Sequence, residues 1–472
     1  MSDPLWNLKE ICDATRGNCA GGGDVPVAGF SIDSRSIEPG EGFIAIRGPN
    51  RDGHDYVNAA LEAGAACAVV NLAFPAGDEK RLVRVADSFG ALNDLGRAAR
   101  ARNGDAVIIA VTGSVGKTGT KEALRLALAP SGAVHASSKS YNNQWGVPLT
   151  LANMPASVAY GVFEIGMNHA GEIDPLTRLV RPHVAIVTTV APVHLGFFRS
   201  VEEIADAKAE IFNGLEPGGT AVINRDNPHF ERLARQARAH GARIVGFGGA
   251  EGADVRLLSA EFSSDGSKVT ADILGETVAY RLGTPGAHHV QNSLAVLAAV
   301  KLAGADLERA AEALGTLHAQ AGRGARMLLE TKGGKVGIVD ESYNANPASM
   351  RAALATLGLV PREAFARRVA VLGDMLELGP EGPRLHAELA EAVDEAGIDV
   401  VFACGELMKS LFEALPASRR GAYAKSAEEL QAGLVEAVGP GDIIMVKGSL
   451  GSRMAPLVVA LKRRFEAESV SA

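Results

Sequence analysis

Residues 107–120, VIIAVTGSVGKTGT, limit the fold of this chain more than any other stretch. Residues 107–111 are apolar and largely β-branched, which predicts a buried strand, and a helix is expected to begin at the end of the stretch. Between them lies a glycine-rich loop, whose backbone N–H groups can surround phosphate oxygens while the helix N-terminus adds its dipole. Lys117 would reach the terminal phosphates, and Thr118 would offer its hydroxyl to Mg²⁺. The stretch therefore predicts a nucleotide-phosphate site made of Gly113, Ser114, Val115, Gly116, Lys117 and Thr118.

The alternative is a glycine-rich turn without a ligand. Val111 stands where the longer G-x-x-x-x-G-K-[ST] pattern has glycine, so the match is to a shorter G-x-x-G-K-T form. The order strand, loop, Lys-Thr and helix is the one that phosphate binding needs, and it favours the nucleotide site over the turn.

Length and composition describe a globular protein of several domains. At 472 residues the chain is too long for one compact core, and three domains are the expected number. Apolar residues make up 47% and charged residues 22%, which is ordinary for a globular chain. The net charge of −8 argues against a general nucleic-acid-binding surface, so we expect no nucleic-acid partner.

The cysteines and the apolar runs indicate the compartment. Cys12, Cys19, Cys67 and Cys404 form no C-x-x-C pair and no metal-ligand cluster, so we expect reduced thiols in a cytoplasmic protein. The N-terminal residues carry mixed charges without an apolar core, and no run approaches about 18 apolar residues. We therefore expect neither export nor membrane insertion, and we expect a monomer.

The pattern of strands and helices predicts three α/β domains. Residues 1–104 alternate short apolar runs with helical patterns, as in a small α/β domain. Residues 105–318 show the rhythm of a parallel sheet covered by helices, with an antiparallel extension at 255–282, where strict alternation appears. The small, basic segment 318–326 is expected to be a hinge. Residues 319–472 then predict a Rossmann-like α/β domain with its own sheet.

Glu164 is a candidate metal ligand. It interrupts the end of the apolar run 158–165, and a carboxylate that closes a buried strand is costly unless a cation or donor meets it. Beside a nucleotide loop that cation would be Mg²⁺. The alternative is a carboxylate that turns outward. His194 follows the next apolar run, but a single histidine is more often structural than a ligand.

Lys208 lies on the apolar face of a predicted helix. That helix is expected to begin at a capping box, Ser200 with Glu203, and to run to about residue 215. The lysine either extends its ammonium to solvent or is desolvated with a lowered pKa. A neutral amine could react with CO₂ to give a carbamate that binds a metal. The sequence leaves these two alternatives open.

Several polar clusters have a structural and a functional interpretation. Residues 31–36 and 48–55 resemble ordinary turns, because Asp, Ser, Asn and Gly favour loops. The His- and Asn-rich start of the helix at 286–302 is compatible with simple capping. Polar loops also follow strands of the third domain, and ligands of parallel sheets bind at that edge. Those loops are residues 340–347, 373–379 and 447–449.

Six motifs together resemble the Mur ligases, ATP-dependent enzymes that extend the peptide of cytoplasmic peptidoglycan precursors. They are TGSVGKT from Thr112, NNQWGVPLTL from Asn142, FEIGMNHAGEI from Phe163, AKAEIF from Ala207, ESYNANP from Glu341 and LGDMLELG from Leu372. Within the family they are most similar to the member that adds a dipeptide. The resemblance implies the substrates UDP-N-acetylmuramoyl-tripeptide, D-alanyl-D-alanine and ATP, and it implies two Mg²⁺ ions.

The resemblance also implies roles for individual residues. Lys117 and its loop would hold ATP phosphates, Thr118 and Glu164 would bind one Mg²⁺, and His194 and a carbamylated Lys208 would bind the second. Contacts to the nucleotide would come from Asn292, Arg323 and Tyr343. Against our preference for plain turns, the uridine site would include Ser34, Arg35, Asn50 and His54. The sugar-peptide would meet Asn142, Asn143 and Asn344.

Some positions depart from the family pattern. His289 replaces the first asparagine of the usual H-N-x-x-N run, and Glu341 replaces the usual aspartate of the D-S-Y-N-A-N motif. Arg326 is a second arginine that could share or take the role of Arg323. These departures put single nucleotide contacts in question and leave the family unchanged.

The implied reaction forms an acyl phosphate from the tripeptide carboxylate and ATP, and the amine of the dipeptide then displaces phosphate. A ligase that adds the third amino acid, or a folylpolyglutamate synthase, is the nearest alternative, but the former usually carries a D-x-P-R motif that is absent here. A regulatory GTPase would need an N-K-x-D motif, which is also absent. A non-catalytic nucleotide-binding protein stays open. The sequence does not fix the third residue of the tripeptide.

Overall fold

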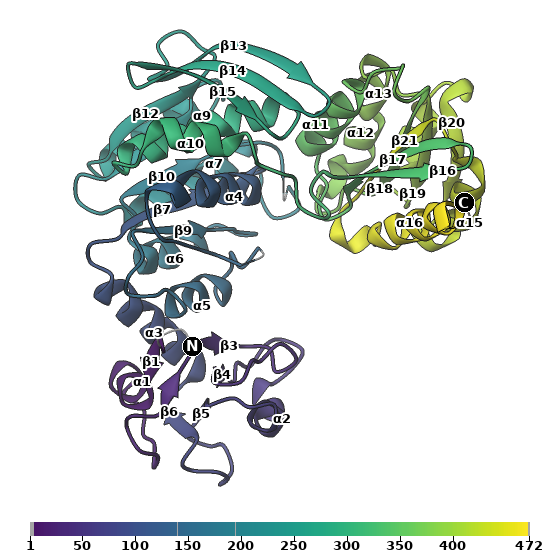
Figure 1. Cartoon of the computed structure of the whole chain (residues 1–472). Helices are drawn as coiled ribbons and strands as arrows, with labels where there is room; N and C mark the ends of the chain where they lie inside the picture. The colour runs from purple at the N-terminus through teal and green to yellow at the C-terminus, as the bar shows by residue number, and fades with distance from the viewer. Residues whose placement is uncertain (1–3, 139, 194, 471–472) are drawn as a thin grey trace.

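The computed structural model describes residues 4–138, 140–193 and 195–470 and contains three α/β domains, with the central domain between the other two in a bent arrangement (Figure 1). Each domain has its own main sheet, and a further two-stranded sheet lies near the N-terminus. None of the described helices is long and apolar enough to cross a lipid bilayer. The prediction of a three-domain α/β architecture is confirmed.

The N-terminal domain is a four-stranded parallel sheet in the order β3-β4-β5-β6. The apolar runs 43–46, 66–70 and 82–85, each of which predicts a strand, overlap β4, β5 and β6. Asp87 caps α3 by accepting hydrogen bonds from two backbone N–H groups. The strands are β1 (Trp6–Asn7), β2 (Pro26–Val27), β3 (Phe30–Ser31), β4 (Gly42–Ile44), β5 (Cys67–Asn71) and β6 (Leu82–Val85), and the helices are α1 (Leu8–Thr15), α2 (Val57–Glu62) and α3 (Ser88–Arg102).

The central domain is a nine-stranded sheet in the order β15-β14-β13-β12-β11-β10-β7-β9-β8. The strands from β7 to β12 pair in parallel, whereas β13, β14 and β15 form the predicted antiparallel meander. The strands are β7 (Val107–Thr112), β8 (Val134–Ala136), β9 (Tyr160–Glu164), β10 (Val184–Val187), β11 (Thr220–Asn224), β12 (Arg243–Gly248), β13 (Val255–Ser263), β14 (Gly266–Ile273) and β15 (Glu276–Leu282).

The helices of the central domain cover both faces of this sheet. One core contains α4 and α9, and the other contains α5 to α8. The helices are α4 (Lys117–Leu128), α5 (Gly146–Ala152), α6 (Ile173–Val180), α7 (Val201–Ala209), α8 (Phe230–Ala239), α9 (Ala287–Leu302) and α10 (Leu307–Leu314).

The prediction for α7 was correct in its start and wrong in two details. Ser200 caps the helix by accepting from the N–H of Glu203, but the Glu203 carboxylate accepts from Arg199 instead of closing the capping box. The α-helix ends at Ala209, and a 3₁₀ turn, Glu210–Gly214, follows it. The apolar face that was predicted for one helix therefore belongs to two consecutive helical segments.

The C-terminal domain is a six-stranded sheet in the order β16-β17-β21-β18-β19-β20, with β16 antiparallel to β17. The strands are β16 (Ala325–Thr331), β17 (Gly334–Glu341), β18 (Arg367–Gly373), β19 (Val400–Cys404), β20 (Arg420–Ala424) and β21 (Asp442–Lys447), and the helices are α11 (Pro347–Gly358), α12 (Gly382–Ala387), α13 (Leu389–Glu395), α14 (Lys409–Ala414), α15 (Ala427–Ala437) and α16 (Ala455–Val470). The apolar runs 336–339, 369–372, 400–403 and 443–446, each of which predicts a strand, lie within β17, β18, β19 and β21. The edge strands β16 and β20 were not predicted, and because β16 begins at Ala325, the connecting segment is shorter than the predicted hinge.

The N-terminal and central domains share a packed boundary. Helices α3 and α5 pack together, and Leu149 and Ala152 of α5 belong to the core of the N-terminal domain. Trp6 Nε1 donates to the carbonyl of Ala152 at 2.8 Å, and the Asn153 amide bonds both backbone groups of Phe30 at 2.7 and 2.9 Å. The two domains are therefore joined by a continuous hydrophobic core.

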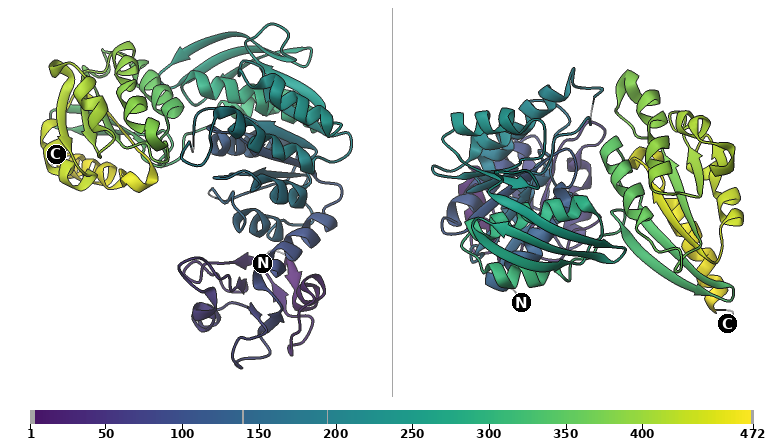
Figure 2. Two further views of the ribbon diagram at one scale, coloured as in Figure 1. Left: turned by 180° about the vertical axis from the view of Figure 1, so that it is seen from behind. Right: turned by 90° about the horizontal axis from the view of Figure 1, so that it is seen from above.

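The central and C-terminal domains meet along a more open boundary, and Figure 2 shows the two bodies side by side. Among the described residues, hydrogen bonds cross it from Gly196 N to Glu377 O at 3.0 Å, from Arg323 to Ser140 at 3.0 Å, and from Arg326 to the carbonyl of Ser264. Most of the remaining boundary is lined by polar side chains that face a cleft.

Candidate functional site

The main cleft lies between the central and C-terminal domains. The space between the two domains, including the part that is open to solvent, has a volume of about 2030 Å³. It is lined by the loop after β7, by the ends of β9 and β11, by the start of α9, and by the loops after β17 and β21. The predicted residues Ser114, Val115, Gly116, Lys117, Thr118, Asn142, Glu164, Asn292, Arg323, Tyr343 and Asn344 all face it.

The glycine-rich loop is held in a fixed shape before any ligand arrives. Gly113 and Gly116 have φ angles of 151° and 87°. A Cβ on Gly113 would lie 1.9 Å from Thr188 Oγ1, so only glycine fits there. The Ser114 hydroxyl donates to the Ala191 carbonyl and accepts from its N–H, which ties the loop to the segment after β10. This anchoring leaves the backbone N–H groups at the start of α4 available for an anion.

Lys117 folds over the loop. Its Nζ donates to the carbonyl of Gly113 at 2.6 Å, and burial lowers the pKa of its ammonium despite the nearby Glu164. A phosphate would offer a stronger, charged acceptor in place of this carbonyl.

Glu164 closes β9 with its side chain buried, as the sequence predicted. The Asn142 amide donates to Glu164 Oε1 at 2.7 Å, whereas Oε2 is buried without a hydrogen-bond partner. A buried carboxylate oxygen without a donor is costly, and a cation would satisfy it. Thr118, which is 4% exposed, lies at the same cleft with its hydroxyl 3.4 Å from Ser140 Oγ. These oxygen atoms fit a hard divalent cation such as Mg²⁺.

Lys208 is buried, which excludes the interpretation that it extends to solvent. The residue is 2% exposed, and burial, with a smaller contribution from Lys117, lowers the pKa of its amine well below the ordinary value of 10.5. Burial thus favours the neutral, nucleophilic form of this amine over the charged form. His194, its predicted partner in metal binding, lies outside the described residues.

The nucleotide contacts predicted from the C-terminal domain include an aromatic stack. The guanidinium of Arg323 lies 4.2 Å from the ring centroid of Tyr343 and donates to Ser140 Oγ at 3.0 Å. Asn292 on α9 lies directly against the phosphate loop, because a Cβ on Gly116 would lie 2.6 Å from its Nδ2. Arg326 is on the other side of the connecting segment, where it lines a smaller pocket and bonds the carbonyl of Ser264.

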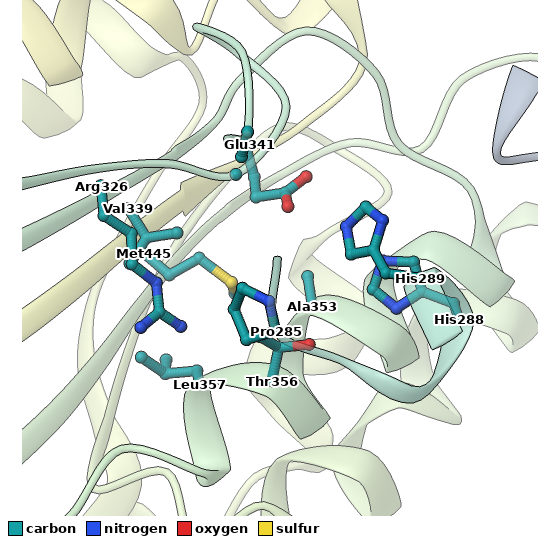
Figure 3. A pocket seen from close by; sticks show the side chains of 12 residues that line it. Pro285, His288, His289, Arg326, Val339, Glu341, Ala353, Thr356, Leu357 and Met445 are labelled. Carbon is teal, nitrogen blue, oxygen red and sulfur yellow. The ribbon is translucent and has the colours of Figure 1, made fainter. Parts of the chain in front are cut away.

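That smaller pocket lies between the start of α9 and the C-terminal domain (Figure 3). The rings of His288 and His289 are in contact, with centroids 4.1 Å apart and planes tilted by 40°, and burial lowers the pKa of both imidazoles, which favours their neutral forms. Glu341 lies across from His289, and its carboxylate forms an ion pair with Lys447 Nζ at 3.0 Å. Both sequence departures, His289 and Glu341, thus meet at the domain boundary.

The predicted uridine-site residues are in the N-terminal domain and do not line the cleft. Arg35 is paired with Asp33 at 2.7 Å on the surface, and Ser34 and Asn50 are in neighbouring loops. Both ring nitrogens of His54 are used within the protein: Nδ1 lies 2.6 Å from Asp52 Oδ1, and Nε2 accepts from the N–H of Asn71 at 3.1 Å. His54 thus holds the loop in shape, as the turn interpretation expected.

The segment 141–146 connects this domain with the cleft. Tyr141 packs on the N-terminal core, and Trp145 lies 3.7 Å from where a Cβ on Gly48 would be. Asn142 reaches Glu164 in the cleft, but Asn143 faces away from it and accepts from the N–H groups of Trp145 and Gly146. Asn143 therefore shapes the start of α5.

Two cleft residues were not given a role from the sequence. Ser140 is in contact with both Thr118 and Arg323, and no pattern marks it before the fold brings these three together. Lys447 closes the buried strand β21, is 2% exposed and pairs with Glu341. The sequence named the loop 447–449 as a candidate ligand-binding loop but gave Lys447 no role of its own, although its position at the end of an apolar run is the same signal that identified Glu164.

A second cleft lies within the C-terminal domain, over the carboxyl ends of β18 to β21. It has an empty volume of about 1380 Å³ and includes the N-terminal ends of α15 and α16. Its charged lining residues are Asp374, Glu406, Lys425, Glu428 and Arg453. In an open parallel sheet this edge is where ligands bind.

Comparison with known proteins places this architecture in a family. Residues 26–88 match the model of the Mur ligase family catalytic domain, residues 111–300 the Mur ligase middle domain, and residues 325–450 the glutamate ligase domain. A UDP-N-acetylmuramoyl-tripeptide–D-alanyl-D-alanine ligase from Rickettsia prowazekii is 32% identical over 455 residues, which are 96% of this chain and 99% of that protein.

Solved structures agree with the sequence comparison. A crystal structure of MurF from Acinetobacter baumannii has a TM-score of 0.85 at 28% identity and covers 98% of this chain and 100% of that one. MurF from Thermotoga maritima in complex with ADP has a TM-score of 0.76 at 26% identity, covering 93% and 98%. With the cleft, the phosphate loop and the three sheets in the same chain order, this chain belongs to the Mur ligase family.

Proposed function

We propose that this chain is the Mur ligase that joins D-alanyl-D-alanine to UDP-N-acetylmuramoyl-tripeptide, with ATP converted to ADP and phosphate. The observation that carries the proposal is the main cleft, in which a phosphate loop and a buried, partly unsatisfied carboxylate face the ESYNANP loop of another domain. Relatives with this activity in their names match nearly the whole chain. The same comparison supports ATP as the nucleotide, since a similar protein was solved with ADP.

The residues of the cleft are suited to bring two anions together. The tripeptide carboxylate must approach the γ-phosphate of ATP, so negative charge has to be neutralised as the acyl phosphate forms. Lys117 and the N–H groups at the start of α4 would hold the phosphates from the central domain. Lys447 and Arg323 add positive charge from the C-terminal domain. Closure of the cleft would keep water from the acyl phosphate.

We assign one Mg²⁺ to Thr118 and Glu164 and a second to His194 and Lys208. The first assignment rests on the partnerless Oε2 of Glu164. The second rests on the buried amine of Lys208, whose lowered pKa favours the neutral form that can add to CO₂ and release a proton to give an anionic carbamate. A free ammonium there would repel a metal ion, whereas carbamate oxygens are suitable ligands. Bound metal ions would stabilise charge on the phosphoryl oxygens.

The two organic substrates are assigned to different domains. Ser34, Arg35 and Asn50 would contact the uridine end of the sugar nucleotide, with His54 supporting the loop, and Asn142 and Asn344 would contact its peptide end. Asn143 would act through the shape of its turn, and Asn292, Arg323 and Tyr343 would bind the ATP base and ribose. For the dipeptide we assign the second cleft, where Lys425 and Arg453 can meet a carboxylate.

The boundaries 1–104, 105–318 and 319–472 are proposed as the three domains, and the protein is proposed to be a cytoplasmic monomer. The separate sheets support the three boundaries.

The direct test is phosphate release by the purified protein with ATP, Mg²⁺, D-alanyl-D-alanine and each UDP-N-acetylmuramoyl-tripeptide in turn. We expect release only when both organic substrates are present, and the preferred tripeptide identifies its third residue. Release with a free amino acid in place of the dipeptide would contradict the proposal and indicate a sister ligase.

A further inference from the structure

Two of the four cysteines form a close pair in the N-terminal domain. Cys12 is in the last turns of α1, and Cys19 is in the loop that follows this helix. The Cys12 thiol donates to Cys19 Sγ, and the two sulfur atoms are 2.9 Å apart. A disulfide bond is about 2.04 Å long, so the sulfurs need to approach by less than ~1 Å to bond.

Access to this pair differs from access to the other thiols. Cys12 and Cys19 are partly exposed, whereas Cys67 and Cys404 are buried. Cys67 is close enough to interact electrostatically with both members of the pair, so three thiols gather beneath α1. An oxidant from solvent can therefore reach the pair, but not the buried thiol beside it.

We propose that Cys12 and Cys19 are a dithiol that a hydroperoxide oxidises to an intramolecular disulfide. The sulfur of Cys19 attacks the peroxide oxygen and becomes a sulfenic acid, while the second oxygen leaves and takes a proton to form water or an alcohol. Cys12 then attacks the sulfur of Cys19, the S–S bond forms, and the sulfenic oxygen leaves as water. The two thiols lose two electrons and two protons, and the hydroperoxide gains them.

The order of the two sulfurs follows from their surroundings. Burial raises the pKa of Cys12 to about 12, with a further increase from its hydrogen bond to Cys19. Cys12 therefore stays a thiol, and its S–H donates toward Cys19, whose sulfur is the acceptor of the pair. Cys19 is thus the sulfur that reacts first, and Cys12 resolves the sulfenic acid.

The bond would fasten the end of α1 to the sheet. Arg16 ends the helix in a left-handed conformation, the N–H of Gly17 bonds the carbonyl of Cys12, and Asn18 forms a β-bridge with Arg84 of β6. A disulfide across this short loop restricts the unfolded chain and stabilises the folded domain. The pair lies in the N-terminal domain, away from the C-terminal domain (Figure 1), so the modification adds stability without blocking the main cleft.

Peptide mapping of the full-length protein tests the proposal directly. Trypsin cleaves after Lys9, Arg16 and Arg35, so Cys12 and Cys19 fall on separate peptides, residues 10–16 and 17–35, while Cys67 falls on residues 52–80. The reduced protein is treated with a small excess of hydrogen peroxide, its free thiols are blocked, and the digest is analysed without reductant. We expect the cross-linked species 10–16 with 17–35, reversed by a thiol reductant.

Three variants separate this bond from other oxidation products. Cys12→Ser and Cys19→Ser should each abolish the cross-link, whereas Cys67→Ala should keep it. Oxidation should raise the urea midpoint of unfolding, followed by tryptophan fluorescence, in the wild type and in Cys67→Ala but in neither serine variant. Sulfinic acid on residues 17–35 without a cross-link, or a link between residues 17–35 and 52–80, would overturn the proposal.

Discussion

The two boundaries of the central domain differ in whether their buried polar groups have hydrogen-bond partners. Toward the N-terminal domain, Arg100 of α3 is buried, and all three of its guanidinium nitrogens bond to protein, to the carbonyls of Val180, Asn103 and Arg181 and to Glu216. Toward the C-terminal domain, Glu164 faces the cleft and keeps a buried carboxylate oxygen without a donor, and Lys208, buried in the same central domain near Lys117, has an amine whose pKa burial lowers well below its usual value.

This difference separates a structural contact from a binding site. A buried polar group that is fully hydrogen-bonded stabilises one arrangement of two domains. A buried polar group that is left unsatisfied costs stability, and a folded protein keeps it where a ligand supplies the missing partner. The N-terminal boundary should therefore respond to mutation mainly in stability, and the C-terminal boundary mainly in activity.

The largest expected effect is at Lys208. Lys208→Ala removes the proposed carbamate and should lower ligation by at least ~10³-fold, because charge on the transferring phosphoryl group loses a metal ligand. Phosphate release measured with both substrates checks this. A short carboxylate such as propionate should restore part of the activity and chloride none. Full activity in the unrescued variant would remove Lys208 from the mechanism.

The next effect tests the packed boundary. Arg100→Ala leaves buried carbonyls without their donor and should lower the free energy of unfolding by ~3 kcal/mol, with little change in kcat while the protein is folded. Urea unfolding followed by the fluorescence of Trp6 and Trp145 reports on this region. Arg97→Ala on the same helix is the matched control. Arg97 forms an exposed ion pair with Asp94, and its removal should lower the free energy of unfolding by less than ~0.5 kcal/mol.

An intermediate effect is expected at the nucleotide. Arg323→Ala removes the stack on Tyr343 and should raise the KM for ATP by about 10-fold with unchanged stability. Arg326→Ala is the control, because Arg326 bonds the Ser264 carbonyl outside the main cleft and its loss should leave the KM for ATP unchanged. If Arg326→Ala raised the KM for ATP and Arg323→Ala did not, the nucleotide contact would be assigned to Arg326 instead of Arg323.

The sequence predicted the parallel strands of the central domain best because they are buried on both faces. Val107–Thr112 and Val184–Val187 are continuous apolar runs. The meander was predicted from the alternation at 255–262, although a register shift between Leu257 and Ser259 interrupts it in the structure. The edge strands β16 and β20 carry charged or small residues, ARMLLET and RGAYA, because one side of each has no neighbouring strand. Local pattern does not distinguish such strands from loops.

The candidate site was predictable where a charged residue lies within an otherwise apolar strand or helix face. Glu164 ends an apolar strand and Lys208 interrupts an apolar helix face, and each is buried as that conflict requires. Ser140 and the Arg323–Tyr343 stack depend on segments that meet only after folding. His54 shows that a resemblance does not give the role of a single side chain. The family resemblance implies substrate binding by this loop, but the hydrogen bonds of His54 go to Asp52 and Asn71 and hold the loop in shape.

The smallest expected effect lies in that loop. The backbone N–H of His54, followed by the His54 and Arg47 side chains, lowers the pKa of Asp52 from 3.8 to about 2. Because the folded pKa is the lower one, the carboxylate stabilises the domain fully above pH 3.8, and this contribution is lost as the pH falls toward 2. Water screens a pair near the surface, so we expect less than ~1 kcal/mol. Unfolding of the wild type and of Asp52→Asn, measured by tryptophan fluorescence at pH 7 and at acid pH, should differ at pH 7 and converge in acid. A difference that persists below pH 2 would assign the stabilisation to the shape of the side chain rather than to its charge.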